Sequence, residues 1–193
     1  MTGRRRRIVI GITGSSGPIY GIRALQILRE QADIEVHLVM TEAARQTISL
    51  ETNWALEKVL ELADVVHENV DLAASISSGS FLTDGMIVAP CSMHTLGEIA
   101  HSMAGNLLTR AADVHLKERR RLVLMVRETP LHLGHLRNMV AAAEAGAIIL
   151  PPIPAFYHHP QTIDDIINHS VGKALDLLSV HHRLFKRWKS PPE

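Results

Sequence analysis

The sequence predicts an α/β protein with a central parallel β-sheet and helices on both of its faces. Short apolar runs, partly β-branched and bounded by glycine, proline or polar residues, are typical of buried strands. They lie at residues 7–13, 35–40, 85–89, 122–126 and 147–150. Longer stretches with helical spacing separate them. This alternation favours parallel strands whose connecting helices cover both faces of the sheet.

The helices that follow these strands are marked by their apolar spacing. The first follows a glycine- and serine-rich turn, and a late one begins at Thr162, a typical N-cap with Asp165 three residues further on. Between them, a serine-rich segment at residues 71–83 breaks the pattern, and we interpret it as a functional loop. The apolar positions are Tyr20, Ile22, Leu25 and Leu28 in the first helix, Met139, Val140 and Ala143 in the next, and Ile163, Ile166, Ile167, Val171, Leu175 and Leu178 in the last.

The chain has 193 residues, enough for one domain with a full core, and its single predicted domain spans residues 1–193. We expect a basic tail at residues 1–6 and a C-terminal tail from about residue 181 to 193. Basic and acidic residues number 20 each, so no net charge attracts nucleic acid or an anionic membrane. The arginines at residues 4–7 are a local exception, which we interpret as solvated rather than as a nucleic-acid-binding arm.

The composition also indicates a cytoplasmic protein without a membrane segment. No stretch approaches the roughly 18 continuous apolar residues of a membrane span. Cys91 is the one cysteine, so no internal disulfide can form, which agrees with a reducing compartment. Because it follows an apolar strand, we expect Cys91 to be buried and structural rather than a nucleophile.

The first strand ends in a turn, residues 11–17, that is suited to an anion. Its glycines let backbone amides approach a ligand, and the following helix N-terminus favours negative charge. The hydroxyls of Thr13, Ser15 and Ser16 add possible donors. The turn lacks the Lys-Ser/Thr of a Walker loop and the spacing of a dinucleotide fingerprint. It predicts a mononucleotide phosphate site, with a tight packing turn as the alternative.

Two further features follow strands of the same predicted sheet. A hydroxyl-rich turn at residues 90–95 could hold a flat cofactor together with the first turn, and its Ser92 could also cap a helix. The segment at residues 110–130 surrounds a buried strand with cations. Arg127 stands where that strand ends, and an arginine there can hold a phosphate or carboxylate with two parallel hydrogen bonds.

Twelve histidines, several of them in close pairs, raise the alternative of a structural metal. The pairs are His132 with His135, His158 with His159, and His181 with His182. None fits the H-E-x-x-H pattern, and no cysteine cluster supports them. We therefore expect no metal site.

Four segments of the chain resemble the UbiX-type flavin prenyltransferases, and the resemblance runs from about residue 8 to residue 178. The segments are GITGSSGPIYGIR, SSGSFLTDGMIVAPCS, LLTRAADVHLKERRRLVLMVRETPLHLGHLRNM and PPIPAFYHHPQTIDDII. The resemblance implies a flavodoxin-like (Rossmann-like) three-layer fold that binds FMN. It also implies a homododecamer with active sites between subunits.

The resemblance implies a metal-independent reaction. A dimethylallyl group from dimethylallyl phosphate is joined to N5 and C6 of reduced FMN, and the prenylated FMN passes to a UbiD-type decarboxylase. Aromatic side chains are expected near the allyl fragment, since a π-face attracts a delocalised cation.

The resemblance also implies roles for individual residues. The residues expected to hold FMN are Gly14, Ser15, Ser16, Thr41, Ser92, Met93, His94, Thr95 and Arg127. Those expected to bind the prenyl phosphate across the subunit interface are Arg110, Lys117, Glu128, Tyr157 and Lys173. The expected catalytic residues are Ser16, Glu51 and Glu128, with Glu51 handling a proton during ring closure, while Trp188 closes over the site.

The chain departs from the family pattern at three positions. Lys173 stands where many relatives have arginine, so a point charge replaces a two-pronged grip. Ser15 replaces a more usual alanine, and Pro18 replaces a small residue but suits a helix start.

Other functions remain open on the residues alone. A flavin-dependent cysteine decarboxylase of the same superfamily should carry an early catalytic histidine, whereas the first one here, His37, falls inside a predicted strand. A non-catalytic FMN carrier would not need Arg110, Lys117 and Tyr157 together. A nucleic-acid binder should present a wider basic face.

Overall fold

The protein, described here by a computed structural model over residues 4–188, is built around one parallel sheet. Its six strands lie in the order β3-β2-β1-β4-β5-β6, and every neighbouring pair is parallel. The strands are β1 (Arg6–Ile12), β2 (Ile34–Met40), β3 (Val65–His67), β4 (Gly85–Cys91), β5 (Leu122–Val126) and β6 (Ile148–Ile149).

The strand order reverses in the middle of the sheet. The chain runs outward from β1 through β2 to β3, then returns to the other side of β1 and runs outward again through β4, β5 and β6. Ile8 of β1 is accordingly paired with both Val36 of β2 and Gly85 of β4. In sheets of this kind ligands bind at the carboxyl ends of the strands beside such a reversal. The fold therefore places a site where β1 and β4 end.

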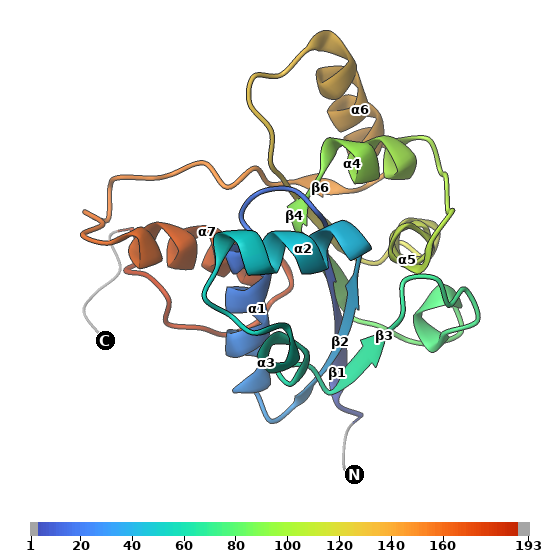
Figure 1. The fold of residues 1–193 in the computed structure, drawn as a ribbon, viewed down its shortest axis with the longest axis horizontal. Coiled ribbons are helices and arrows are strands. Elements are labelled where there is room, and N and C mark those ends of the chain that lie inside the picture. Colours follow the sequence, from blue (N-terminus) through green and yellow to red (C-terminus); the bar gives the residue numbers. More distant parts are fainter. Residues whose placement is uncertain (1–3, 189–193) are drawn as a thin grey trace.

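Helices cover both faces of the sheet, which gives three layers (Figure 1). Helices α1 and α7 pack on one face, and α4 and α5 pack on the other. The helices are α1 (Ile19–Arg29), α2 (Glu42–Glu51), α3 (Leu56–Leu60), α4 (Met93–Ala100), α5 (Leu107–Lys117), α6 (Leu133–Glu144) and α7 (Ile163–Leu177), with a short 3-10 helix η1 (Ser75–Ser77).

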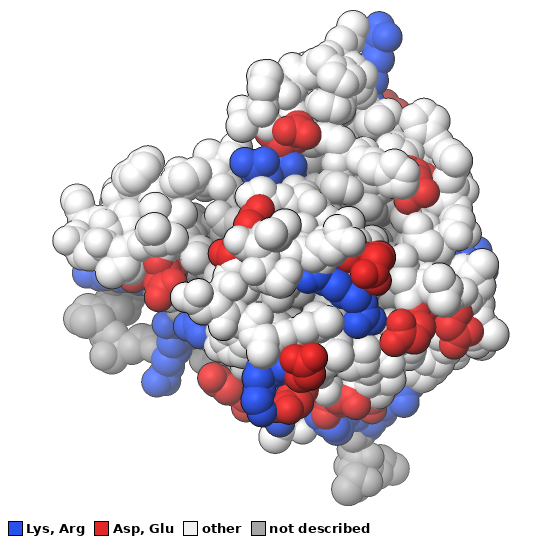
Figure 2. All heavy atoms as spheres, in the orientation of Figure 1, with Lys and Arg blue, Asp and Glu red and all other residues white. Residues whose placement is uncertain are grey.

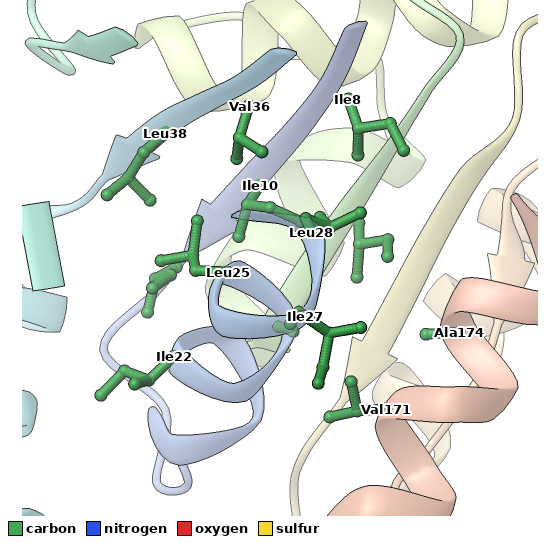
Figure 3. Close-up of a cluster of buried hydrophobic side chains, with 14 of the residues drawn as sticks. Ile8, Ile10, Ile22, Leu25, Ile27, Leu28, Val36, Leu38, Val171 and Ala174 are labelled. Atoms are coloured by element: carbon green, nitrogen blue, oxygen red, sulfur yellow. The ribbon is translucent and has the colours of Figure 1, made fainter. Parts of the chain in front are cut away.

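The core follows from the two-residue period of the strands. Ile8 and Ile10 of β1 are fully buried on the face covered by α1, where Leu28 meets them (Figure 3). Val9, between them, points to the opposite face and joins the cluster under α5. On the first face, Ile27 of α1 extends the cluster toward α7 (Figure 3). Burying such side chains supplies the main driving force for folding.

The predicted fold is confirmed. All five predicted strands exist, and the sheet is wholly parallel with helices on both faces. The structure adds β3, a three-residue edge strand that the apolar pattern did not reveal. Thr162 caps α7 in a capping box with Asp165, as its spacing predicted. Within the described residues, no helix combines the length and apolarity needed to cross a bilayer.

The N-terminal arginines differ from the expected solvated tail, because each one is tied to the folded body. Arg4 contacts Asp84, and Arg5 contacts Asp64. Arg6 begins β1 and donates to the backbone at the end of α7, while Arg7 pairs with Glu35. These side chains fasten the sheet's amino-terminal edge.

The segment that follows α7 also differs from the expected free tail. His182 is buried and contacts the Gly172 carbonyl and the Asp176 carboxylate. Arg187 grips Asp176 with two hydrogen bonds of 2.9 and 2.7 Å. The chain thus folds back along α7 as far as Trp188, and the rest of the expected tail, residues 189–193, lies outside the described residues.

Candidate active site

The ends of β1 and β4 are joined by one buried hydroxyl. Thr13 is 1% exposed, and its Oγ1 donates to the Pro90 carbonyl at 2.8 Å while accepting from the Ser92 amide at 2.9 Å. The two hydroxyl-rich turns are therefore held side by side, as the sequence predicted. The Thr13 hydroxyl itself is committed to this link, so our expectation that it donates to a phosphate is wrong.

The end of β5 joins the same edge. The Ser15 hydroxyl donates to the Arg127 carbonyl at 3.0 Å, and the Arg127 amide donates to the Cys91 carbonyl at 3.1 Å. These bonds fix the backbone at Arg127 beside the first turn while its side chain remains exposed. A cation is thereby held next to the turn predicted to bind an anion.

Helix α2 delivers a carboxylate to the first turn. It begins after β2 with Thr41 as its N-cap, whose Oγ1 accepts from the Ala44 amide at 3.1 Å, and it ends at Glu51. One oxygen of Glu51 accepts from the Ser16 hydroxyl at 3.1 Å and from the Gly17 amide at 2.8 Å. The expected proximity of Ser16 and Glu51 is present.

Gly14 packs closely against the start of α2. A Cβ on Gly14 would lie 2.4 Å from the Cβ of Ala43, so no larger residue fits without displacing the helix. Gly17 adopts a φ of 92°, a conformation that glycine reaches without strain. The glycines of this turn therefore serve both its shape and its contact with α2.

The second turn, residues 90–95, both begins helix α4 and lies beside the first turn. Ser92 caps α4, since its Oγ accepts from the Thr95 amide at 3.2 Å. Thr95 is buried and Met93 is half-buried, whereas His94 is exposed with Glu98 3.6 Å away. The cap and a ligand-facing turn are thus compatible.

Burial and charge shape the titration of groups at this edge. Burial raises the pKa of Tyr20 on α1, and the nearby positive charge of Arg127 opposes that rise. Burial also raises the pKa of Cys91 to about 12, so its thiol stays protonated at neutral pH. A buried neutral thiol is a poor nucleophile, which agrees with the structural role expected for Cys91.

A second group of predicted residues lies along α7. The Tyr157 hydroxyl and His169 Nε2 are 2.9 Å apart, and the Tyr157 ring meets the Trp188 ring edge-on with centroids 5.5 Å apart. Lys173 follows His169 by one helical turn and is exposed. Tyr157, Lys173 and Trp188 therefore belong to one surface of the subunit.

Arg110 and Lys117 lie elsewhere, on α5. Arg110 pairs with Asp113 at 2.8 Å and donates to the Ser77 carbonyl at 3.1 Å. Lys117 pairs with the Glu118 carboxylate at 2.5 Å. In these described contacts the two cations bind neighbours on α5 and on the serine-rich segment, rather than Glu51 or the first turn.

Glu128 directly follows Arg127 and is exposed. Its Oε1 accepts from the Thr129 amide at 2.9 Å, which fixes the carboxylate on the loop that leads to α6. Glu128 thus lies next to the FMN-binding candidate Arg127, and its expected role at the prenyl phosphate stays a prediction.

Sequence reasoning missed two residues of these groups. Tyr20 appeared as a core position of α1, yet it lies within the electrostatic reach of Arg127. His169 went unnoticed because it lies on the α7 face whose apolar residues carried the helical pattern. Its spacing from Tyr157 gave no signal, since the connecting loop has no regular period.

The donors at the carboxyl edge fit a phosphate-bearing flavin. The two turns bring backbone amides and the half-buried hydroxyls of Ser15 and Ser16 beside the exposed Arg127 guanidinium, a set that suits a phosphate monoester. The ends of β1, β4 and β5 lie side by side at this edge, and such a row of strand ends suits a flat ring system. Across residues 4–188, no group of three or more histidine, cysteine or acidic side chains is placed to hold a metal ion.

The sheet, its strand reversal and the turns at its carboxyl edge define a nucleotide-binding α/β protein of the doubly wound type. The chain matches the Flavoprotein family over residues 2–175 and belongs to it. More narrowly, the chain belongs to the UbiX-type flavin prenyltransferases. It is 61% identical over 186 residues to flavin prenyltransferase UbiX of Escherichia coli strain K12, covering 95% of this chain and 98% of that protein.

Solved structures agree with this placement. AnUbiX (PadA1), in complex with FMN and dimethylallyl pyrophosphate, superposes with a TM-score of 0.94 at 51% identity, covering 98% of this chain and 100% of that one. A dodecameric FMN-dependent UbiX-like decarboxylase from Escherichia coli O157:H7 gives 0.93 at 49% identity, covering 95% and 100%. The cysteine decarboxylase TvaF is 17% identical and shares the fold alone.

Proposed function

We propose that the protein joins a dimethylallyl group to N5 and C6 of reduced FMN and releases prenylated FMN. Membership of the flavin prenyltransferases supports the reaction class. The observation that carries the proposal is the Glu51 carboxylate, which α2 brings to the Ser16 hydroxyl at the turn best suited to FMN. A carrier that only bound FMN would have no need of an acid at this point.

The residues proposed to bind FMN surround the strand reversal. Backbone amides and hydroxyls of both turns would hold the phosphate and ribityl chain, with Arg127 supplying the positive charge. Thr41, at the start of α2, borders the first turn through the Thr41 amide, which donates to the Ile12 carbonyl at 3.0 Å. The full set is Gly14, Ser15, Ser16, Thr41, Ser92, Met93, His94, Thr95 and Arg127.

The donor must be held by positive charge that strengthens as its C–O bond breaks. The phosphate leaves with the electron pair of that bond, and a cation 4 Å away stabilises it by roughly 4 kcal/mol at an effective dielectric near 20. We propose Tyr157 and Lys173 on one subunit as ligands, with Trp188 covering the allyl fragment. Within one chain, Arg110 and Lys117 contact acidic neighbours on and beside α5 and not the residues of the Tyr157 group. We therefore propose that they reach the same phosphate from a neighbouring subunit.

Ring closure adds a proton to the allyl double bond as C6 attacks it and then releases the proton of C6, and we propose that Glu51 handles this proton. Its carboxylate is exposed and already accepts from Ser16, so a proton can pass along this hydroxyl. Glu128 is held on the facing loop, where it would orient the leaving group or pass on its proton.

Assembly and location complete the proposal. We propose a homododecamer with its active sites between subunits, supported by the dodecameric relative. A UbiD-type decarboxylase would receive the product, and the cytoplasm, where the free buried Cys91 would stay reduced, would be the compartment.

The donor is proposed to be dimethylallyl phosphate. The relative that binds dimethylallyl pyrophosphate shows that a related site accepts the same allyl group on a larger leaving group. Parallel reactions with the two donors, at equal concentrations, identify the better substrate from initial rates.

A coupled assay tests the function. The protein is mixed anaerobically with reduced FMN and dimethylallyl phosphate, and the filtrate is added to an apo UbiD-type decarboxylase. Decarboxylase activity should appear only when all three components were present. Activity that is equal without the protein, or absent with it, would overturn the proposal.

A binding experiment separates the two proposed ligand sets. We expect Lys117→Ala to weaken binding of dimethylallyl phosphate while FMN affinity stays intact. Because Lys117 would act across subunits, the oligomeric mass of the Lys117→Ala variant is checked first by light scattering. Equal loss of both affinities would move Lys117 out of the donor site.

A further inference from the structure

A histidine of α7 holds the phenol of Tyr157. Tyr157 lies in the proline-rich loop after β6, which crosses the surface to reach α7 (Figure 1). Its hydroxyl lies 2.9 Å from Nε2 of His169, twelve residues further along the chain. A residue of this loop is thus joined to α7 by a hydrogen bond.

His169 is fixed more firmly than Tyr157. Its side chain lies on the inner side of α7 and is 8% exposed, whereas Tyr157 is 41% exposed. The ring of His158 stacks on His169 with centroids 4.8 Å apart and planes 7° apart, and the tilted ring of Phe185 contacts His169 with centroids 4.7 Å apart. With two ring neighbours and little exposure, the imidazole has limited freedom to turn away from Tyr157.

His169 remains neutral near neutral pH. Burial lowers its pKa, and the electrostatic interactions with His158 and Lys173 lower it further. A neutral imidazole carries one N–H, which can lie on either nitrogen. The direction of the hydrogen bond to Tyr157 therefore depends on what else the phenol must bind.

We propose that His169 is a positioning residue that donates its Nε2–H to the oxygen of Tyr157 and so turns the phenolic proton toward the phosphate of the prenyl donor. This inference rests on the proposed function, because it takes Tyr157 as a donor ligand. A phosphate anion needs a hydrogen-bond donor. If the Tyr157 hydroxyl donated its proton to His169, it could offer the phosphate only its lone pairs. With the Nε2–H tautomer, Tyr157 accepts from His169 and donates to the phosphate, and both groups are satisfied.

The same arrangement explains how Tyr157 can serve a site from an exposed loop. Its ring meets three rings edge-on, those of His158, His169 and Trp188, each with centroids 5.5 Å away, and Trp188 is itself 66% exposed. Without His169, the Tyr157 hydroxyl would lose its 2.9 Å hydrogen bond, so the substrate would have to orient that hydroxyl, and the ordering would weaken donor binding. His169 is thus expected to act on donor affinity more than on the chemical step.

A double-mutant cycle tests the inference in the full-length, FMN-binding enzyme. We expect His169→Phe, which keeps an aromatic ring in contact with His158 and Phe185, to raise KM for dimethylallyl phosphate about tenfold, the usual scale of one lost hydrogen bond, with little change in kcat. Tyr157→Phe should have a similar effect. The double variant should resemble Tyr157→Phe alone, because His169 acts through the phenol.

Controls separate a positioning role from simple damage to the fold. His159→Asn alters an exposed histidine two residues beyond Tyr157, in a backbone conformation that asparagine tolerates, and should leave KM unchanged. His169→Gln, whose amide can still donate, should recover part of the lost affinity, and it carries the test if His169→Phe does not fold. Independent, additive effects of Tyr157→Phe and His169→Phe, or an unchanged KM in both His169 variants, would overturn the proposal.

A second readout does not depend on turnover. Trp54 and Trp188 are the two tryptophans, so Trp54→Phe isolates the fluorescence of Trp188 beside the Tyr157 ring. In that background His169→Phe should shift the emission, because Tyr157 loses its anchor, and His159→Asn should not. If the emission shifts but the wild-type enzyme transfers no prenyl group, the proposed function is refuted and the anchoring of Tyr157 by His169 stands. If the emission does not change, the anchoring itself is refuted.

Discussion

Glu51 draws its importance from two contacts that its place in the sequence does not reveal. Alone, it reads as an exposed acid at the end of a helix, and it gained a role only through the family resemblance. The structure shows that the carboxylate accepts from Ser16 and from the Gly17 amide, so α2 holds one acid at the first turn, where we propose that FMN binds.

Replacing Glu51 tests that role. Glu51→Gln keeps an oxygen that can accept from Ser16 and Gly17, so FMN binding and stability should change little. Loss of the proton acceptor should slow product formation about a hundredfold, as for removal of a general base. Flavin titration gives the FMN affinity, and chromatographic product analysis gives the rate. Normal turnover would remove Glu51 from proton handling.

A buried histidine predicts how stability depends on pH. His115 on α5 is fully buried, with Nδ1 2.7 Å from the Ala111 carbonyl and Nε2 3.0 Å from Thr83 Oγ1. Burial lowers its pKa from the ordinary 6.5 to about 4. Between these values the unfolded chain binds a proton that the folded chain excludes, so stability is complete above pH 6.5 and falls as the pH drops toward 4.

The size of this loss is about 3 kcal/mol for His115 alone, an order-of-magnitude figure. His115→Gln should therefore flatten the fall in unfolding free energy between neutral and acidic pH, although other buried histidines still contribute. Urea unfolding at several pH values and a fixed protein concentration measures the free energy of unfolding of each variant. His181→Gln, at an exposed position, is the control. Equal pH slopes in wild type and His115→Gln would contradict the assignment.

The histidines show which side-chain roles the sequence could not reveal. His169 and His115 have no motif, and their roles depend on contacts with Tyr157 and Thr83 that bridge separate segments. The positions of Ser16 and Arg127 followed from the sequence, because Ser16 lies in the turn after β1 and Arg127 directly follows β5, and the carboxyl ends of parallel strands meet at one edge. Their place relative to the predicted strands was enough to assign them to this edge, without knowledge of any tertiary contact.

At the scale of elements, the site depends on how strand ends are joined. Thr13 links β1 to β4, and Ser15 links β1 to the end of β5. These hydrogen bonds set the spacing of the two turns before any ligand binds. A site prepared in this way spends less binding energy on ordering itself.

Thr13→Val tests the link between the turns. Valine has nearly the same shape but leaves the Ser92 amide without its partner, which should lower the free energy of unfolding by about 1–3 kcal/mol. FMN affinity should also fall, because the second turn loses its anchor. Denaturation and flavin titration measure both. Ser49→Ala, which removes an exposed hydroxyl bonded within α2, is the control and should change neither. Unaltered FMN affinity in Thr13→Val would contradict the role of the link.

Elements were predictable where burial imposed a period. The central strands are fully buried and read as continuous apolar runs, whereas β3 is a three-residue edge strand with too little pattern to detect. Helix α6 shows the opposite failure. Its apolar residues predicted a core face, yet Val140 is 57% exposed and only Ala142 is buried. The pattern was real, but nothing within residues 4–188 covers this face of α6.

At the scale of the whole molecule, the exposed apolar surface indicates assembly. Helix α6 packs on α4 and contacts the edge strand β6, while most of its length lies beyond the sheet (Figure 1). The surface around it carries few charges, whereas both signs are mixed over the lower part of the same face (Figure 2). Leu133, Leu136 and Val140 are exposed on α6. Apolar patches of this kind on a folded chain mark subunit contacts.

Assembly is testable on α6. Leu136→Glu places a charge in the proposed contact and should lower the oligomeric mass measured by light scattering. Prenyl transfer should fall with it, because Arg110 and Lys117 would no longer reach a neighbouring site. Arg137→Gln, at the next and also exposed position, should preserve both. A full-sized assembly in Leu136→Glu would exclude α6 from the interface.

The N-terminal arginines illustrate how whole-molecule contacts override local composition. Four consecutive cations read as a solvated tail, but they fasten β1 to Asp84, Asp64 and Glu35 and to the end of α7. Charge composition alone could not show this, since the partners lie far along the chain. The arginines are accordingly part of the fold.

The most direct test of the account is the mass of the flavin after reaction. The protein is incubated anaerobically with reduced FMN and dimethylallyl phosphate, and the released flavin is analysed by mass spectrometry and absorbance. We predict a flavin heavier than FMN by one C5H8 unit, with an altered spectrum, and its loss when either the donor or the enzyme is omitted. A flavin of unchanged mass, under conditions in which a related flavin prenyltransferase converts it, would contradict the account.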